Sequence, residues 1–309
     1  TLLASSAASD VYKRQYLYII AAASLWGLIG LFVKILSSQG FSSMQIVALR
    51  SLASAVCITA VLCKLGKEYF RVHWQDLWLF IGTGILSLTF FNYCYFNCIN
   101  ASSLAAAALL LYTAPIFVML MSLVLFHERF TITKGIALLT TFIGCALITG
   151  ILNTAAEFSF TALLYGLGSG IGYALYSIFG KFAVRKYSSA TISAYTFYFS
   201  TLSSLPLADF SAGNGQWNIT TLMAALGIGG LCAVIPYLLY NRGLQEVEAT
   251  QASILATVEP LVAACVGILC FNEPVTWQKL TGIALILASV IILNLHSKNV
   301  SRPDTNTGC

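Results

Sequence analysis

Hydrophobic positions along the chain gather into ten long runs that short polar connections separate. An α-helix needs about 20 apolar residues to cross the hydrocarbon core of a bilayer, and each run is close to that length. The predicted spans are 16–36, 43–63, 76–98, 102–126, 133–152, 159–181, 190–208, 219–240, 250–271 and 278–296. The pattern therefore predicts an all-α membrane protein with ten transmembrane helices, in which successive helices run antiparallel.

The second half of the chain repeats the first half at a nearly constant spacing. The clearest matches, each 145 positions apart, are Leu110 with Leu255, Pro115 with Pro260, Glu128 with Glu273, Thr131 with Thr276 and Lys134 with Lys279. Five spans per half is an odd number, so the second half must be inverted in the membrane relative to the first. We predict two inverted five-helix repeats over 16–152 and 153–296, as in many secondary transporters.

The two ends of the chain differ from these repeats. Residues 1–15 are mostly small or polar and change abruptly into the first apolar run, so we expect a non-native or disordered segment that is separate from the fold. Residues 297–309 are polar, and we expect a disordered cytoplasmic tail.

Composition and charge placement support this topology. The chain is 58% hydrophobic and 9% charged, whereas soluble domains carry about 25% charged residues. Eleven Lys and Arg residues lie in the even-numbered connections and the C-terminal tail, against two on the other side. Because connections rich in Lys and Arg stay in the cytoplasm, we predict that both termini are cytoplasmic.

Two charged residues lie well inside predicted spans, Arg50 in the second and Glu259 in the ninth. A charge at the bilayer centre costs roughly 2.5–3.5 kcal/mol, so each residue should face a cavity or a partner. Glu259 directly precedes Pro260, which removes a hydrogen bond from the helix and frees a carbonyl one turn earlier. Glu259 is a candidate for binding a cation, a proton or a substrate amine. The alternatives are a hydrogen bond between helices for Glu259, and an anchored carbonyl or ion pair for Arg50.

Pro115 in the fourth span is the counterpart of Pro260. Matched interruptions in the two halves of a repeat indicate a binding site near the membrane midplane. The alternative is a kink that only improves packing.

Side chains with aromatic rings or amide groups form a third set of candidates, which suit a cavity for an amphipathic organic solute. The alternative is a belt at the membrane interface, and Tyr95 and Tyr240 near helix ends are the most typical of a belt. The candidates for the cavity are Trp26, Asn92, Tyr112, Tyr173, Tyr176 and Tyr237.

Lys34 and Lys181 end equivalent helices on opposite sides of the predicted bilayer. Both residues are candidates for gates. A lysine at a helix C-terminus also interacts favourably with the negative end of the helix dipole and reaches toward the interface, which is the simpler explanation.

Motifs typical of enzymes do not occur in the sequence. It contains no Gly-x-Ser-x-Gly, no HExxH and no Walker A pattern. Cys94 and Cys98 lie one helical turn apart, but no His or second Cys pair accompanies them, so we interpret them as small hydrophobic residues. We predict no catalytic residue, no metal, no cofactor and no nucleic-acid partner.

Several short motifs, in their order along the chain, resemble the EamA-type carriers of the drug/metabolite transporter superfamily. These motifs are Trp26-Gly27 and Lys34, Arg50, Pro115 followed by His127-Glu128-Arg129, and Glu259-Pro260 followed by Asn272-Glu273-Pro274. The resemblance covers residues 16–296 and implies a carrier of small metabolites, such as amino acids, in the bacterial inner membrane. It also implies a central cavity between the halves. We expect a monomer, because each chain already contains both halves. The first half departs from the pattern, because Ala114 stands where Glu259 has its counterpart.

These observations lead to a hypothesis of secondary active transport by alternating access, with export as the expected direction. Glu259 would bind a coupled proton or a substrate cation, Arg50 a carboxylate, and the tyrosines the organic body of the substrate. Two alternatives remain at this point: a channel-like facilitator for a small neutral solute, and a membrane sensor that transports nothing.

Overall fold

The computed structural model describes residues 2–153, 159–211 and 215–300, and every regular element in these ranges is helical. The α-helices are α1 (Leu2–Trp26), α2 (Ile29–Ser38), α3 (Ser43–Leu65), α4 (Leu77–Ile81), α5 (Phe90–Ala101), α6 (Leu104–Leu111), α7 (Ala114–Leu125), α8 (Ile132–Thr149), α9 (Phe160–Ala183), α10 (Ser189–Ser204), α11 (Ile219–Gly229), α12 (Ile235–Leu244), α13 (Ala249–Ala256), α14 (Val258–Phe271) and α15 (Trp277–Val300). Three short 3-10 helices are η1 (Lys67–Phe70), η2 (Trp74–Asp76) and η4 (Ile151–Asn153), and two π-helical segments are η3 (Gly82–Thr89) and η5 (Gly230–Val234).

Polar residues in the connections determine where many helices begin. A side-chain oxygen at the N-cap accepts a hydrogen bond from an otherwise unpaired N–H of the first turn. The N-cap residues that do so are Ser42, Ser103, Thr131, Ser159, Ser188 and Asn218, before α3, α6, α8, α9, α10 and α11.

Eight helical stretches are long and apolar enough to cross a membrane, between Arg14–Ser38 at the start and Ala249–Phe271 at the end. Trp277–Leu293 in α15 is a shorter apolar helix, and α10 is not among the eight. Large apolar side chains such as Leu120, Leu139 and Leu269 are exposed on the outside, as lipid-facing residues should be. The prediction of an all-helical membrane protein is thus confirmed, whereas ten spans and an inverted repeat stay predictions.

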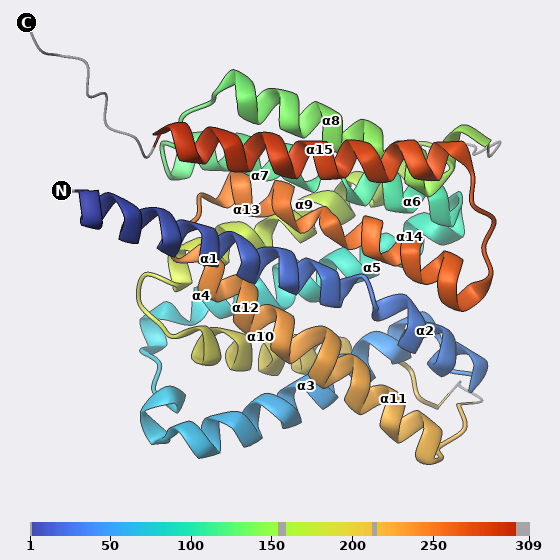
Figure 1. Ribbon diagram of the computed structural model, residues 1–309. Helices are drawn as coiled ribbons and strands as arrows, with labels where there is room; N and C mark the ends of the chain where they lie inside the picture. Colours follow the sequence, from blue (N-terminus) through green and yellow to red (C-terminus); the bar gives the residue numbers. More distant parts are fainter. Residues whose placement is uncertain (1, 154–158, 212–214, 301–309) are drawn as a thin grey trace, which may run out of the picture.

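The helices form one bundle, in which α8 and α15 run nearly parallel and α3 and α11 cross each other (Figure 1). α8 and α15 pack side by side along one edge, and α3 packs against α10 and α11 along the other edge. α1 packs against α12 and α13 between these edges, and α9 packs against α5, α6 and α7. Residues 2–15 continue the first predicted span toward the N-terminus within α1, and residues 301–309 of the predicted tail lie outside the described part of the chain.

Three of the spans are broken near their middle. α6 gives way to α7 at Tyr112 and Thr113, and α13 gives way to α14 at Thr257. In each case the proline lies in the first turn of the second helix, where its missing N–H is tolerated. Pro115 and Pro260 therefore start new helices rather than kink continuous ones.

The third break separates α1 from α2 at Gly27 and Leu28. A Cβ atom at Gly27 would lie 2.8 Å from the backbone carbonyl oxygen of Glu259 and 2.6 Å from Cβ of Val262. The absence of a side chain at Gly27 therefore allows this break to approach the first turn of α14 closely.

Candidate functional site

A small cavity lies where the ends of α1 and α13, at two of the breaks, meet α9 and α12. Its volume is about 20 Å³, enough for about one water molecule. The lining residues come from α1, η3, α5, α9, α12 and α13, and they are Trp26, Ser87, Phe91, Tyr173, Tyr176, Ser177, Tyr237, Tyr240 and Ala256.

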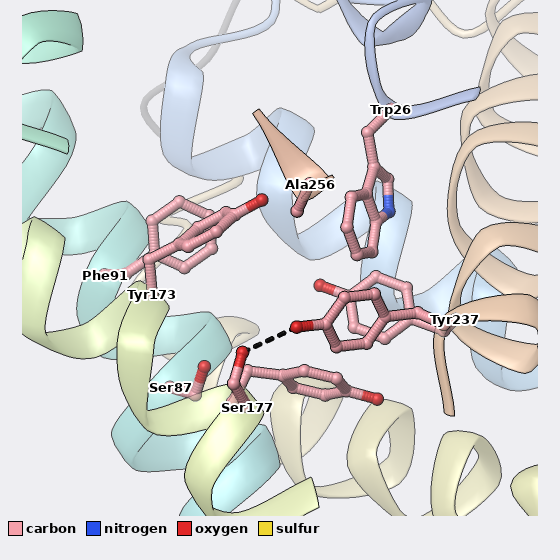
Figure 2. Close-up of a pocket in the computed structure, with 9 residues that line it drawn as sticks. Trp26, Ser87, Phe91, Tyr173, Ser177, Tyr237 and Ala256 are labelled. Carbon is pink, nitrogen blue, oxygen red and sulfur yellow. Dashed lines mark hydrogen bonds between the residues drawn. The ribbon is translucent and has the colours of Figure 1, made fainter. Parts of the chain in front are cut away.

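Aromatic rings form most of the cavity wall. Figure 2 shows Trp26 and Tyr237 meeting on one side and Phe91 and Tyr173 on the other. The ring of Trp26 lies 5.3 Å from that of Tyr237 in an edge-to-face contact and 5.3 Å from that of Tyr240. Tyr176 and Tyr237 are 4.8 Å apart, also edge to face. These separations are in the favourable range for aromatic pairs, so the rings hold one another in place.

Hydrogen bonds hold the polar ends of two tyrosines in place. The hydroxyls of Tyr240 and Ser177 are 2.7 Å apart, the interaction drawn in Figure 2. The Tyr176 hydroxyl donates to Oδ1 of Asn241 at 3.1 Å, and the Asn241 amide donates to Ser193. All these partners lie in α9, α10 and α12, so this network ties together helices of the second half.

Glu259 lies beside the cavity, in the first turn of α14. Its Oε2 accepts a hydrogen bond of 2.8 Å from the hydroxyl of Tyr173, which lines the cavity. A carboxylate in a first helical turn is stabilised by the positive end of the helix dipole. Pro260 has no N–H to donate to the carbonyl of Ala256, and Ala256 also lines the cavity. Acceptor groups therefore concentrate on this side.

Hydrogen-bond donors also lie at the cavity and beside it. The Arg50 guanidinium interacts with the Tyr237 hydroxyl, and its charge acts on Glu259. Within the described part of the chain, three buried polar atoms have no hydrogen-bond partner near this site: Nε of Arg50, Nε1 of Trp26 and Oγ of Ser87. A buried donor without a partner costs about 1–3 kcal/mol, which a bound acceptor would recover.

The other predicted residues occupy different places. Asn92 is buried, its amide donates to the carbonyl of Leu88 at the end of η3 at 2.7 Å, and it does not line the cavity. Tyr112 lies at the break between α6 and α7, within the electrostatic reach of Glu259. Pro115 is buried in the first turn of α7 and does not line the cavity.

Tyr240 corrects one prediction. Its place near the end of a predicted span assigns it to the interfacial belt, yet it is 2% exposed and lines the cavity. The sequence contains the signal, since Tyr237 and Tyr240 are three positions apart on one helix face. Sequence reasoning misses four further lining residues: Ser87, Phe91, Ser177 and Ala256. Ser87 and Ser177 lie four positions from Phe91 and Tyr173, so each pair shares a helix face.

The two candidate gate lysines contact different groups. Nζ of Lys181 donates to the carbonyls of Leu244 at 2.8 Å and Val247 at 2.7 Å, where α12 ends. This arrangement satisfies carbonyls that a helix end leaves unpaired. Lys34 is exposed, and its Nζ lies 3.8 Å from the centre of the Phe271 ring at the end of α14. Both lysines therefore connect separate spans at opposite ends of the bundle.

The fold and the cavity together define a multi-pass membrane protein with an aromatic cavity enclosed among broken helices. Comparison of the sequence with protein families makes the assignment specific: the EamA-like transporter family matches residues 13–150 and 160–295. The chain belongs to this family, as its motifs suggest, and it is a transporter rather than an enzyme.

Individual relatives agree with this assignment. An uncharacterized transporter of Archaeoglobus fulgidus is 34% identical over 67% of this chain and 75% of its own length. The uncharacterized inner membrane transporter YicL of Salmonella typhimurium is 24% identical over 94% of this chain and 98% of its own length. The threonine/homoserine exporter RhtA of the same species is 24% identical over 66% of this chain and 67% of its own length. A solved crystal structure with 18% sequence identity matches with a TM-score of 0.78 over 93% of this chain and 99% of the other, and it shows the same fold.

Proposed function

We propose that the chain is a secondary active transporter that exports small zwitterionic metabolites of the amino-acid class across the bacterial inner membrane by alternating access. The observation that carries this proposal is the arrangement of opposite polarities around one aromatic cavity. The Glu259 carboxylate bonds to Tyr173, which lines the cavity, while Trp26 in the cavity wall and Arg50 beside Tyr237 contain buried donors without a partner among the described residues. A zwitterion complements these groups, with its ammonium group at Glu259 and its carboxylate at Arg50 and Trp26.

The size of the cavity supports a transport cycle with at least two conformations. Pockets for small organic ligands commonly measure about 300–1,000 Å³, and this cavity measures about 20 Å³. The helices must therefore separate before a metabolite enters, and the breaks beside Gly27, Pro115 and Pro260 supply places where the spans can bend. A closed cavity of this kind favours a carrier over a continuously open channel.

We also propose proton coupling through Glu259. A carboxylate that binds the substrate ammonium in one half of the cycle and a proton in the other half exchanges the two across the membrane. The relative named as a threonine/homoserine exporter supports amino acids as the first substrates to test, and export as the direction.

The test is counterflow in proteoliposomes that contain the purified protein and are preloaded with unlabelled amino acids. We expect labelled threonine or a related amino acid to accumulate by exchange, which a channel does not support. Flux that follows the gradient without exchange would favour the facilitator instead. Absence of any flux across an amino-acid panel, with the protein correctly inserted, would contradict the proposal.

Glu259→Gln is the first variant to measure. Loss of the charge should reduce exchange at least about tenfold, because a hydrogen bond to a charged group contributes roughly 1.5–3 kcal/mol. The pH dependence of transport should disappear with it. Tyr173→Phe, which removes only the donor, is the matched control and should have a smaller effect. Full transport with unchanged pH dependence in Glu259→Gln would remove Glu259 from the mechanism.

A further inference from the structure

At one end of the bundle, a carboxylate from the first half of the chain caps a helix of the second half. Oε1 of Glu128, just after α7, accepts a hydrogen bond of 2.7 Å from the backbone N–H of Ala249. Its Oε2 accepts from the N–H of Thr250 at 3.3 Å and from the Thr250 hydroxyl at 2.6 Å. These groups form the N-terminus of α13, which a carboxylate stabilises through both hydrogen bonding and the helix dipole.

An ion pair reinforces the same junction. Nζ of Lys134 lies 2.5 Å from Oε2 of Glu248, the N-cap residue of α13, and Lys134 is 3% exposed. Lys134 also donates to the carbonyl of Arg129 at 2.8 Å, which holds the connection that contains Glu128. The connections rich in Lys and Arg lie at this end of the bundle, which we call the basic end. We call the junction of Glu128, Lys134 and Glu248 with the start of α13 the basic-end lock.

The opposite end contains the corresponding residues, but they are arranged differently. Glu273 and Lys279, which lie 145 positions after Glu128 and Lys134, pair with each other at 2.7 Å within the second half and are partly exposed. The counterpart of α13 is α6, which begins 145 positions before it and is also eight residues long. Here Ser103, the counterpart of Glu248, caps α6 by accepting from the N–H of Ala106.

We propose that Glu128 and Glu273 act alternately as caps that close the two ends of the carrier. In the conformation seen here Glu128 caps α13 and the basic end is closed. In the opposite conformation Glu273 leaves Lys279 and accepts from the N–H groups of Leu104 and Ala105, while α13 releases Glu128. This inference rests on the proposed alternating access and inverted repeat. Each released helix N-terminus then faces the open, water-filled side, where water satisfies its N–H groups.

The two locks are unequal, because Ser103 stands where the basic-end lock has Glu248. Lys279 therefore has no acidic partner at the N-cap of α6, whereas Lys134 has one at the N-cap of α13. The basic-end lock contains an ion pair that its counterpart lacks. The substrate-free carrier should therefore favour closure at the basic end.

Distances between spin labels in proteoliposomes test the proposal without a substrate. One pair of labels replaces the exposed Arg129 and Glu246 at the basic end, and the other replaces the exposed Asn100 and Val275 at the opposite end. The labels are attached to genetically encoded unnatural amino acids, so the nine native cysteines stay in place. We expect Glu128→Ala to lengthen the Arg129–Glu246 distance and to raise the open-to-closed ratio at least about tenfold, equivalent to roughly 1.4 kcal/mol.

Glu273→Ala is the matched control, because Glu273 does not contribute to the basic-end lock in this conformation. It should leave the Arg129–Glu246 distance short. If Glu128→Ala leaves this distance unchanged, or if Glu273→Ala lengthens it equally, the alternation of caps is wrong. Glu128→Gln, which keeps an acceptor oxygen but loses the charge, replaces Glu128→Ala if the latter does not fold.

A gain of function provides an independent test. Ser103→Glu supplies the acid that the opposite end lacks, and it should shorten the Asn100–Val275 distance while lengthening the Arg129–Glu246 distance. Unchanged distances would overturn the role of α6. These distances are measured without substrate, so the test of the locks does not depend on the identity of the substrate. If the distances change as expected but the protein exchanges no amino acid, the proposed substrate is wrong and the alternation of caps is still supported.

Discussion

At the scale of single residues, the sequence identifies the charged groups of the site more readily than its tyrosines. Glu259 and Arg50 stand out because charge is rare inside apolar spans, and the structure brings both within electrostatic reach of each other. Tyrosines are harder to assign, since a ring with a polar end suits both a cavity and a membrane interface. Tyr240 and Asn92 show the limit: whether each faces the cavity depends on the rotation of its helix, which neighbouring helices set.

Trp26 provides the clearest test at this scale. Its Nε1 is buried without a partner among the described residues, although its ring packs against Tyr237 and Tyr240. Trp26→Phe keeps an aromatic ring but removes the donor together with part of the ring volume. We expect some loss of stability, because the smaller ring packs less well against Tyr237 and Tyr240. We also expect a roughly tenfold or greater loss of affinity for a substrate that carries a carboxylate, because a hydrogen bond to a charged group is lost.

A matched pair of ligands serves as the control for Trp26→Phe. Competition of counterflow is measured with a transported amino acid and with the corresponding amine that lacks the carboxylate. Affinity for the amine should not change between Trp26→Phe and the parent protein. An equal loss for both ligands would show that the indole N–H does not contact the carboxylate.

At the scale of elements, the positions of the helical spans are more predictable than their interruptions. A run of about 20 apolar residues predicts a span whatever it packs against. Pro115 and Pro260 signal two of the breaks, because proline has no N–H to continue a helix. The break at Gly27 and the π-helical segments η3 and η5 have no comparable local signal. They depend on contacts with other spans, such as the one between Gly27 and Glu259.

The break at Gly27 leads to a prediction about stability and transport. A Cβ atom there would lie within 2.8 Å of the Glu259 carbonyl oxygen, so Gly27→Ala must displace α14 or the end of α1. Overpacking of this kind costs roughly 1–3 kcal/mol. We expect the melting temperature in detergent to fall by several degrees and exchange activity to decrease.

Gly30→Ala is the matched control, because a Cβ atom at Gly30 meets nothing within 4 Å. Alanine is also a better helix former than glycine within α2, by up to about 1 kcal/mol. The Gly30→Ala protein should melt at the same temperature as the parent protein or higher. If both variants lose stability equally, the close approach at Gly27 is not what limits substitution there.

At the scale of the whole molecule, the number of membrane crossings depends on α10. This helix has 16 residues and is rich in Ser and Thr, so it falls short of an apolar span. Its hydroxyls are nevertheless buried against other helices: Ser200 lies 2.9 Å from Ser51, and Thr196 lies 2.7 Å from Thr83. A span that is surrounded by protein needs no apolar face toward lipid. Composition alone therefore does not identify such a helix as a membrane span.

Contacts at the two ends of α10 support a full crossing. Near its start, Thr191 donates to the carbonyl of Tyr69, in the connection that also contains His73. Beyond its end, the carbonyl of Asp209 accepts from Gln45 at the start of α3. Gln45 lies in the first turn of α3 and Tyr69 lies just after its last residue, so the two contacts are at opposite ends of α3, which is itself one of the eight apolar spans. We infer that α10 reaches from one membrane face to the other.

This inference predicts opposite accessibility for the two ends of α10. Lys186 precedes the helix and Ser211 follows it, and both are exposed. A cysteine replaces each of them in turn, in a background where the exposed Cys63 and Cys270 and the C-terminal Cys309 are serine. With ten crossings and cytoplasmic termini, a membrane-impermeant thiol reagent should label the cysteine at 211 in intact cells and the cysteine at 186 only after permeabilisation. Labelling of both from one side would mean that α10 does not cross, and the inverted five-helix repeat would fail with it, because the second half would then contain an even number of spans.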